Sequence, residues 1–318
     1  MRRLLVTRRM TLEAEAAIGA VFEAIFRDET VPLTEAEAAE ALRSHDAIIP
    51  TLGDAFTAAA FAGGGLQTRV LANFGAGYNH IDTDAARAAD VIVTNTPEVV
   101  TEATADIAVM LMLMTARRAS EAERVLRAGA WTGWTPTQFL GRHLGGKTVG
   151  IIGMGRIGKA IARRCHFGFD MRVVFFNRSP VSSLHTPAAQ LPTLEAVLRE
   201  SDFVVLAVPG GAGTRHLIDA AALATLGPNG ILINISRGDV VDESALIAAL
   251  EAGTIAGAGL DVFEHEPEVP ARLRETRNTT LLPHIGTAAE EVRTAMAMRA
   301  LDNLRAVAAG RPAPDRVA

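Results

Sequence analysis

Short apolar runs alternate along the chain with longer segments in which apolar residues recur at helical spacing. In the first third of the sequence the short runs lie at 4–7, 47–51, 69–73 and 91–94, and helical segments at 12–26 and 35–42 separate them. Strands that alternate with helices in this way predict a parallel sheet covered by helices on both faces.

A second series of short runs begins near residue 147. Its expected strands are 148–153, 172–176, 203–208, 231–235, 258–262 and 280–283, and its helices include 157–166, 194–200 and 243–251. These runs are apolar and rich in β-branched residues, which is typical of a parallel sheet buried on both faces. At about 150 residues per domain, 318 residues correspond to two domains, each of the α/β class.

Two long helices are expected outside these series. The first covers 101–128, with acidic residues in its first turn and Arg127 and Gly129 at its end, an order that suits the helix dipole and its caps. Residues 129–146, with both tryptophans, follow as an extended surface loop. The last helix covers 288–309.

Composition narrows the class of protein. The chain is 49% apolar and 21% charged, as in ordinary globular proteins. Its net charge of -5 offers no electrostatic argument for binding nucleic acid or anionic membranes. The longest apolar stretch, 107–116, is too short to span a bilayer, and residues 1–10 lack the apolar core of a signal peptide. A single cysteine, Cys165, fits a reducing compartment, so we expect a cytoplasmic protein.

A glycine motif indicates a dinucleotide site. Gly153, Gly155 and Gly158 form a GxGxxG pattern directly after the expected strand at 148–153 and at the start of a helix. In that context the glycines allow a tight turn, close approach of a pyrophosphate and close helix–strand packing. The pyrophosphate would lie at the helix N-terminus, where free N–H groups favour anions.

The end of the next strand bears on which cofactor binds. NAD-binding proteins usually carry an acidic residue about 20 residues beyond the motif, where it bonds the ribose hydroxyls. Asn177 stands there instead, followed by Arg178 and Ser179. An arginine and a serine can bind a 2′-phosphate that a carboxylate would repel, so NADP is preferred and NAD is the alternative.

Candidate catalytic residues follow three later strands. Arg237 comes after 231–235, Glu264, His265 and Glu266 come after 258–262, and His284 comes after 280–283. The carboxyl ends of parallel strands share one sheet edge, where ligands bind. Arginine can hold a carboxylate and polarise a carbonyl, and a histidine supported by a carboxylate can pass a proton. By position alone, Glu264 competes with Glu266 for this role, and His265 with His284.

The remaining histidines show no partner pattern, and no metal site is expected. His80, in the segment 77–82, is interpreted as structural. No set of His, Asp and Glu has the spacing of metal ligands. The other histidines are in loops or at helix ends: His45, His143, His166, His185 and His216.

Together these motifs resemble the D-isomer-specific 2-hydroxyacid dehydrogenases. The resemblance spans nearly the whole chain, and its most specific segments are 153–158, 235–242, 259–267 and 283–286. Within the family the sequence is most similar to glyoxylate/hydroxypyruvate reductases, on segments 75–82, 131–136 and 177–179. Asn79 departs from the aspartate that many members carry, and little effect on the chemistry is expected.

The resemblance implies a role for each matching residue. Arg237 would bind the substrate carboxylate and carbonyl, His284 would be the general acid–base, and Glu266 its partner. Substrate contacts would also come from Leu52, the backbone of Gly75, Ala76 and Gly77, and Trp134. The cofactor would be bound by Thr104, Gly153, Gly155, Arg156, Ile157, Gly158, Asn177, Arg178, Ser179, Val208, Pro209, Thr214, Ile235, Asp261 and Gly286.

The resemblance also implies a domain organisation. A flavodoxin-like substrate domain would combine 1–97 with 287–318, and a Rossmann dinucleotide domain would be inserted as 98–286, with a cleft between them. Both sheets would be doubly wound. Relatives form dimers through the dinucleotide domain and the tryptophan loop, so a homodimer is expected.

The sequence therefore predicts NADPH-dependent reduction of a small 2-oxo acid, glyoxylate or hydroxypyruvate, to the D-2-hydroxy acid. One alternative is an inactive, dinucleotide-sensing regulatory protein. Joint retention of Arg237, Glu266 and His284 argues against it, because a sensor needs only the glycine loop. A second alternative is the same chemistry on a larger 2-oxo acid.

Overall fold

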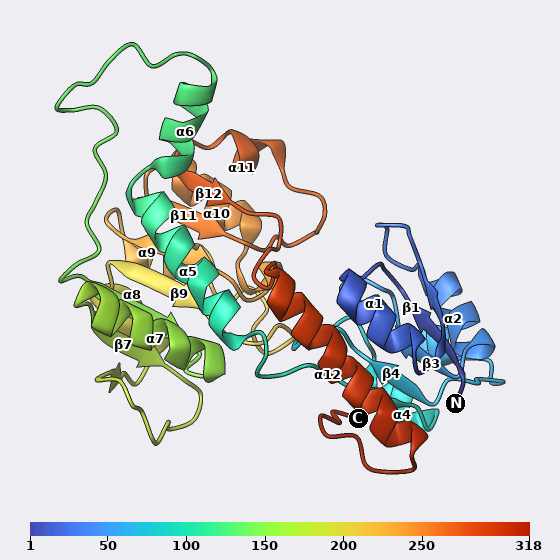
Figure 1. Cartoon of the computed structure of the whole chain (residues 1–318). Helices are drawn as coiled ribbons and strands as arrows, with labels where there is room; N and C mark the ends of the chain where they lie inside the picture. Colours follow the sequence, from blue (N-terminus) through green and yellow to red (C-terminus); the bar gives the residue numbers. More distant parts are fainter. The chain divides into compact units, whose positions relative to one another are not determined.

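The computed structural model describes all 318 residues, and the chain separates into two compact units. Unit 1 comprises Met1–Val100 and Thr287–Ala318, and unit 2 comprises Thr101–Gly286. Each unit has its own parallel sheet with helices on both faces (Figure 1). The prediction of two parallel-sheet α/β units is confirmed.

Unit 1 is built on a five-stranded sheet in the order β2-β1-β3-β4-β5, with every strand pair parallel. The strands are β1 (Arg3–Val6), β2 (Glu23–Phe26), β3 (Ala47–Ile49), β4 (Val70–Ala72) and β5 (Ile92–Thr94). The helices are α1 (Leu12–Gly19), α2 (Glu35–Ser44), α3 (Ala58–Phe61), α4 (Thr83–Ala88) and α12 (Glu290–Ala308).

Alternation along each strand divides the core of unit 1 between two faces. Leu4 and Val6 pack with α1 and with Leu301 and Leu304 of α12 on one face. Leu5, the residue between them, packs with the helices α2, α3 and α4 on the other. The last helix of the chain thus supplies part of the core of the first unit.

Unit 2 is built on a seven-stranded parallel sheet in the order β12-β11-β10-β9-β6-β7-β8. Its strands are β6 (Thr148–Ile152), β7 (Arg172–Phe176), β8 (Ala189–Gln190), β9 (Phe203–Leu206), β10 (Ile231–Asn234), β11 (Gly257–Leu260) and β12 (Thr279–Leu281). Its helices are α5 (Thr101–Ala116), α6 (Ala119–Arg127), α7 (Arg156–Phe169), α8 (Leu194–Glu200), α9 (Ala220–Leu226), α10 (Glu243–Glu251) and α11 (Ala271–Glu275), with a short 3₁₀ turn at Gly238–Val240.

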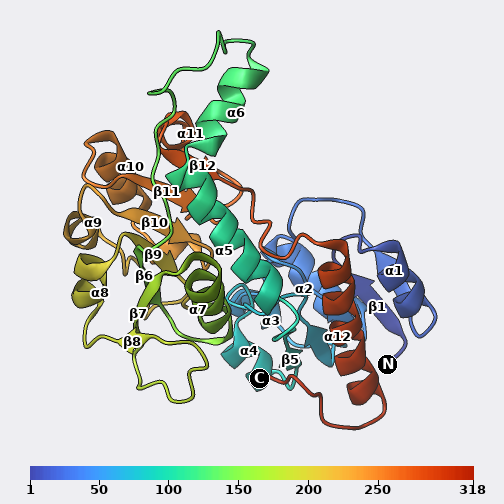
Figure 2. The ribbon, with the colours of Figure 1, turned by 60° about the vertical axis from the view of Figure 1, so that its left-hand side comes forward.

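Different helices cover the two faces of this sheet, as can be followed in Figures 1 and 2. Helices α5 and α7 cover one face, where Ile151 lies among their buried residues. Helices α8, α9 and α10 cover the other, where Ile152 is buried. The strand order reverses between β6 and β9, and open α/β sheets bind ligands beside such a switch point.

The expected helix at 12–26 is wrong in its second half. The helix α1 ends at Gly19, and Glu23–Phe26 instead forms the edge strand β2, which pairs with β1. Its residues alternate between exposed and half-buried, as on an edge strand. The local sign of the break is Gly19 at the end of α1, and a single glycine within a helical pattern does not by itself predict that the helix ends.

The single helix expected at 101–128 is two helices. The backbone N–H of Arg142 donates to the carbonyl of Ala116 over 2.7 Å, at the end of α5. Arg118 then adopts a left-handed conformation with φ of 53°, and α6 begins at Ala119. A segment distant in the sequence therefore occupies the carbonyl that a continuous helix would use, which the local pattern cannot show.

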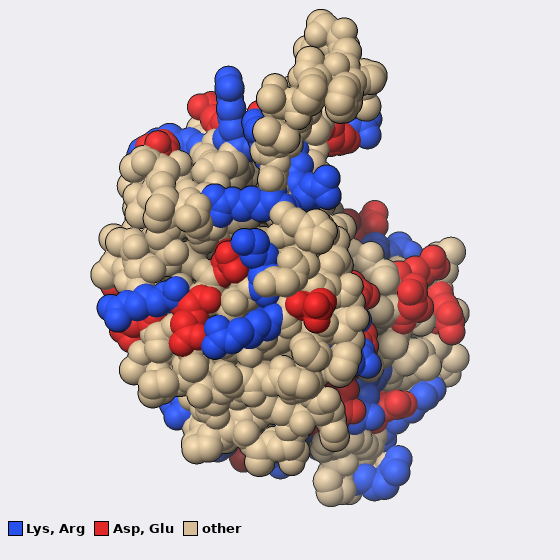
Figure 3. All heavy atoms as spheres, turned by 90° about the vertical axis from the view of Figure 1, so that its left-hand side faces the viewer, with Lys and Arg blue, Asp and Glu red and all other residues tan.

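No helix of the protein is both long and apolar enough to cross a membrane. The face of the molecule in Figure 3 carries interspersed basic and acidic side chains. Ion pairs between neighbouring helices occur in unit 2, for example between Arg164 of α7 and Asp106 of α5.

Candidate active site

The glycine motif forms a tight turn between β6 and α7. Gly153 has φ of 98°, and a Cβ on it would lie 2.6 Å from the carbonyl oxygen of Ala207. A Cβ on Gly158 would overlap the carbonyl of Gly153, so helix and strand pack here without space for a side chain. Gly155 faces open space, and no side chain caps the first turn of α7. The turn therefore fits a dinucleotide pyrophosphate, which the uncapped helix N-terminus would bind.

Asn177, at the end of β7, is bound to the same turn. Its Oδ1 accepts a hydrogen bond from the backbone N–H of Met154 over 3.2 Å, and its Nδ2 donates to the carbonyl of Ser179. Arg178 and Ser179 are exposed beyond it. The place where an acidic residue would bond a ribose is thus taken by a neutral amide next to an exposed arginine.

Arg237 follows β10 in a loop that side-chain hydrogen bonds shape. The Oδ1 of Asn234 accepts from the N–H and hydroxyl of Ser236, and its Nδ2 donates to the carbonyl of Arg237. Burial lowers the pKa of Arg237, and the nearby carboxylates of Glu266 and Asp239 oppose that effect. A guanidinium remains charged in proteins, so the loop presents a partly buried cation.

His284, after β12, is hydrogen-bonded to Glu266. The distance from His284 Nδ1 to Glu266 Oε2 is 2.8 Å, and Glu266 Oε1 accepts from the N–H of Phe263 over 3.0 Å. Burial would raise the pKa of Glu266. Interactions with three residues outweigh burial and lower the pKa of Glu266: the hydrogen bond and charge of His284, the N–H of Phe263 and the charge of Arg237. The carboxylate therefore stays ionised and orients the ring, leaving Nε2 for a substrate.

Asp261, after β11, is buried against the loop that carries His284. Its Oδ1 accepts from the N–H of Ile285 over 2.7 Å, and a Cβ on Gly286 would lie 3.2 Å from its Oδ2. Burial raises the pKa of Asp261, although the backbone N–H groups and His284 act in the opposite direction. Thr104 of α5 is buried beside Gly286.

Glu264 and His265 are not part of this pair. Glu264 accepts from His216 Nε2 over 2.8 Å and from Arg215 over 3.1 Å, and His265 is exposed. His216 therefore has an acidic partner, contrary to the sequence interpretation. The pair connects the loop after β9 to the loop that carries Glu266. It was missed because the two residues lie 48 positions apart.

The remaining expected cofactor residues line the same carboxyl edge of the sheet. Thr214 closes the loop after β9, where its hydroxyl donates to the carbonyl of Pro209 over 2.7 Å. Val208 lies near the start of this loop, and Ile235 is buried directly after β10.

The expected substrate residues lie on separate segments. Leu52 follows β3, and the loop 75–77 follows β4, both at the carboxyl edge of the unit 1 sheet. Trp134 lies in unit 2, in the extended segment after α6, and is 78% exposed.

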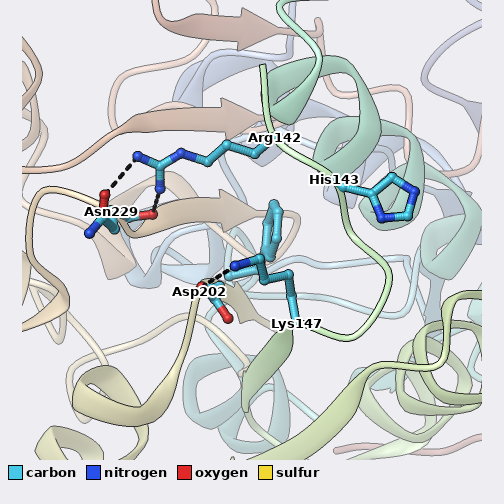
Figure 4. A pocket seen from close by; sticks show the side chains of 6 residues that line it. Arg142, His143, Lys147, Asp202 and Asn229 are labelled. Carbon is cyan, nitrogen blue, oxygen red and sulfur yellow. Dashed lines mark hydrogen bonds and ion pairs between the residues drawn. The ribbon is translucent and has the colours of Figure 1, made fainter. Parts of the chain in front are cut away.

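A cavity of about 450 Å³ in unit 2 lies away from these residues. It is beside the starts of β6 and β9, at the amino ends of the strands, as the lining residues in Figure 4 show. Its charged groups already have partners: Arg142 is bound to Asn229, and Lys147 lies 3.6 Å from Asp202. The catalytic candidates are at the opposite, carboxyl end of the sheet.

Comparisons with known proteins agree on one family. Residues 109–286 match the family model described as D-isomer specific 2-hydroxyacid dehydrogenase, NAD binding domain. The chain is 40% identical to glyoxylate reductase of Pyrococcus furiosus, covering 99% of this chain and 95% of that one. It is 36% identical to glycerate dehydrogenase of Hyphomicrobium methylovorum, covering 97% of each.

A solved structure gives the same result. The NADPH-dependent glyoxylate/hydroxypyruvate reductase of Sinorhizobium meliloti, in complex with NADP and malonate, superposes with a TM-score of 0.88. That protein is 37% identical to this chain, and the comparison covers 100% of this chain and 97% of the other.

Proposed function

Since the chain belongs to the D-isomer-specific 2-hydroxyacid dehydrogenases, and is thus an NAD(P)-dependent oxidoreductase, we propose that it reduces glyoxylate or hydroxypyruvate to the D-2-hydroxy acid. The observation that carries this proposal is the His284–Glu266 hydrogen bond at the sheet edge that also bears Arg237 and the glycine turn. Glyoxylate reductases among the relatives support the choice of substrate.

Each side chain has a defined task in the proposed reaction. Protonated His284 donates its Nε2 proton to the substrate oxygen, and Glu266 stabilises the imidazolium before transfer. Arg237 binds the carboxylate and stabilises the negative charge that develops on the oxygen. Bound NADPH supplies the hydride. Asp261 orients the His284 loop through Ile285 and would hold the carboxamide of a bound nicotinamide.

The two units contribute different groups in this proposal. Unit 2 binds the cofactor and provides the acid–base pair, with 98–286 as the dinucleotide domain. Unit 1, as 1–97 and 287–318, holds the substrate carboxylate on the N–H groups of Ala76 and Gly77, and Leu52 contacts the substrate. Backbone N–H groups in a turn of this kind form an anion-binding nest.

NADPH preference is proposed from Asn177, Arg178 and Ser179. No carboxylate stands at this position to repel a 2′-phosphate, and the guanidinium of Arg178 is exposed beside it. Arginine binds phosphate through several charge-assisted hydrogen bonds. The reductase of Sinorhizobium meliloti, which is in complex with NADP, supports this preference.

One panel of assays tests substrate and cofactor together. The purified protein is assayed with glyoxylate, hydroxypyruvate, pyruvate and phenylpyruvate, each with NADPH and with NADH. The expected result is the highest kcat/KM with one of the first two acids and NADPH. Absence of turnover with all four acids would contradict the enzymatic proposal, and equal kcat/KM with both cofactors would contradict the NADPH preference.

The proposal includes a cytoplasmic homodimer. The single thiol, Cys165, is buried and unpaired, as is usual in a reducing compartment. The segment after α6 projects from unit 2 and is almost free of charge in Figure 3. Trp131, Trp134 and Leu140 are exposed along it, which favours burial against a second copy.

A further inference from the structure

In the loop 75–77, which follows β4, each of the three backbone carbonyl groups accepts a hydrogen bond from elsewhere in unit 1. Asn73 Nδ2 donates to the carbonyl of Gly75 over 2.9 Å and to that of Gly77 over 3.0 Å. Both hydrogens of one amide therefore bind alternate carbonyls of one turn. Reversing this amide would place an oxygen against two other oxygens, so its orientation is set by the loop.

The carbonyl between these two has a different donor. Asn95, directly after the neighbouring strand β5, donates from Nδ2 to the carbonyl of Ala76 over 2.8 Å. The backbone N–H of Thr96 adds a second bond to the carbonyl of Gly75 over 3.0 Å. Donors from two adjacent strands thus bind three consecutive carbonyls.

This arrangement determines where the N–H groups of the loop point. In a planar trans peptide, the N–H of one residue points opposite to the carbonyl of the residue before it. The carbonyls of Gly75 and Ala76 point toward Asn73 and Asn95, which donate to them. The N–H groups of Ala76 and Gly77 therefore point away from these two side chains. Neither N–H has a hydrogen-bond partner in the protein. Gly75 has φ of 154°, a conformation that favours glycine.

The burial of Asn73 indicates that its role is to hold the conformation of the loop 75–77. Asn73 is fully buried, and its Oδ1 has no hydrogen-bond partner in the protein. An unpaired buried acceptor is destabilising, and an apolar residue of similar shape would avoid it. Its two donated bonds supply a reason for an amide at this position.

We propose that Asn73 and Asn95 are positioning residues that aim the N–H groups of Ala76 and Gly77 at the substrate carboxylate. This inference rests on the proposed function and adds two residues to it. Neither amide touches the substrate, since both act through the peptide groups of the loop. Their contribution is preorganisation, because the N–H groups need no reorientation when the anion binds.

Two variants and a matched control test this role. Asn73→Asp keeps the shape but replaces the two donors with an acceptor, and Asn95→Ala removes one donor from a half-buried position. Thr68→Val is the control, because Thr68 is a buried polar residue of unit 1 whose hydroxyl donates to the carbonyl of His45 before the start of β4, at the end of that strand opposite to the loop. The readouts are KM and kcat with glyoxylate, the Kd of malonate by calorimetry in the presence of NADPH, and the Kd of NADPH by fluorescence.

Malonate is a useful probe because it offers carboxylates but no ketone to reduce. Both loop variants should raise the KM for glyoxylate and the Kd of malonate by roughly tenfold, with kcat changed by less than about threefold. The Kd of NADPH should stay unchanged. The control should lower Tm without changing KM or the Kd of malonate.

The outcomes separate this inference from the proposed function. If the wild type reduces 2-oxo acids and both loop variants keep the wild-type KM and malonate affinity, the inference is overturned. If the wild type reduces none of the acids, the proposed function fails, and the calorimetric comparison still decides whether the two amides position an anion site. If the control weakens malonate as much as the loop variants do, a general loss of stability explains the effect and the inference is rejected.

Discussion

His284 has a backbone conformation that residues other than glycine rarely adopt, with φ of 53°. Such a conformation costs free energy and persists only where surrounding contacts hold it. Here its own N–H donates to the carbonyl of Leu282, and the next N–H, of Ile285, donates to Asp261. The imidazole is therefore oriented twice, through its backbone by Asp261 and through its ring by Glu266.

Replacing His284 tests the acid–base role at the scale of one residue. His284→Gln keeps a polar side chain of similar length but cannot donate a proton to the substrate oxygen. We expect kcat for 2-oxo acid reduction to fall by about 10²–10⁴. The Kd of NADPH, measured by fluorescence, should change little, because the glycine turn is untouched. A variant with near wild-type kcat would remove His284 from the mechanism.

Glu243 provides a prediction about pH and stability. It is buried at the start of α10, and burial raises its pKa, with the nearby carboxylate of Glu264 adding to the shift. A carboxyl with a raised pKa in the folded state binds its proton more tightly there than in the unfolded chain. Its ionisation therefore lowers stability as pH rises above the ordinary value of 4.5, until the folded group is also ionised.

Glu243→Gln removes that ionisation. The variant should have a higher Tm than the wild type at pH 8, and the difference should vanish near pH 4, where both side chains are neutral. Glu251, at the other end of α10, is the control, because its ion pair with Arg272 lowers its pKa. Glu251→Gln should not raise Tm at pH 8. A Glu243→Gln variant that is less stable than the wild type at pH 8 would show that its charge is favourable.

At the scale of elements, the active-site loops are packed against one another through a glycine. A Cβ on Gly238, at the start of the 3₁₀ turn after β10, would overlap the backbone of Phe263 and Glu264. This close contact fixes the position of the loop that carries Arg237 relative to the loop that carries Glu266. The His216–Glu264 bond adds the loop after β9 to the same assembly.

Gly238→Ala should separate these loops. We expect a loss of about 1–3 kcal/mol of unfolding free energy from overpacking, together with a large fall in kcat/KM. Gly213→Ala is the matched control, since no atom lies within 4 Å of a Cβ at that position and the glycine has no left-handed conformation. Its stability should stay within about 0.5 kcal/mol of the wild type. Urea denaturation measures the free energy of unfolding of both variants. An equal loss in the two would contradict the packing argument.

At the scale of the whole molecule, the prediction concerns assembly. Trp131 and Trp134 are 51% and 78% exposed on a segment that projects from unit 2. Light scattering should give about twice the 33.6 kDa mass of one chain. The double variant Trp131→Ser, Trp134→Ser should shift the protein toward the single-chain mass.

The control for assembly is another exposed aromatic residue. Phe167 on α7 is 66% exposed and lies outside the projecting segment, so Phe167→Ser should keep the wild-type mass. Retention of the wild-type circular dichroism spectrum would show that each variant is folded. A wild type that has the mass of one chain, or a double variant that keeps twice that mass, would contradict assembly through these tryptophans.

Much of the fold could be predicted because its signals are local. Strands such as β7 and helices such as α8 and α10 have the same bounds in the structure as in the sequence interpretation. The glycine turn was recognised because three glycines and a preceding strand are contiguous. The edge strand β2 and the break at Arg118 were not predicted, because both depend on contacts with segments far away in the sequence.

The sequence by itself determined the α/β class and the strand ends that carry Arg237, Glu266 and His284, since burial periodicity and glycine geometry are properties of neighbouring residues. Position along the chain did not distinguish Glu264 from Glu266 as the carboxylate partner of the histidine, and only the resemblance to a family favoured Glu266. Tertiary structure decided that Glu266 lies against His284 and Glu264 against His216. It also decided that Asn73 and Asn95 meet at one loop. The physical reason is strand order: hydrogen bonds between loops form only after distant strands have been placed side by side, and no local period records which strands those are.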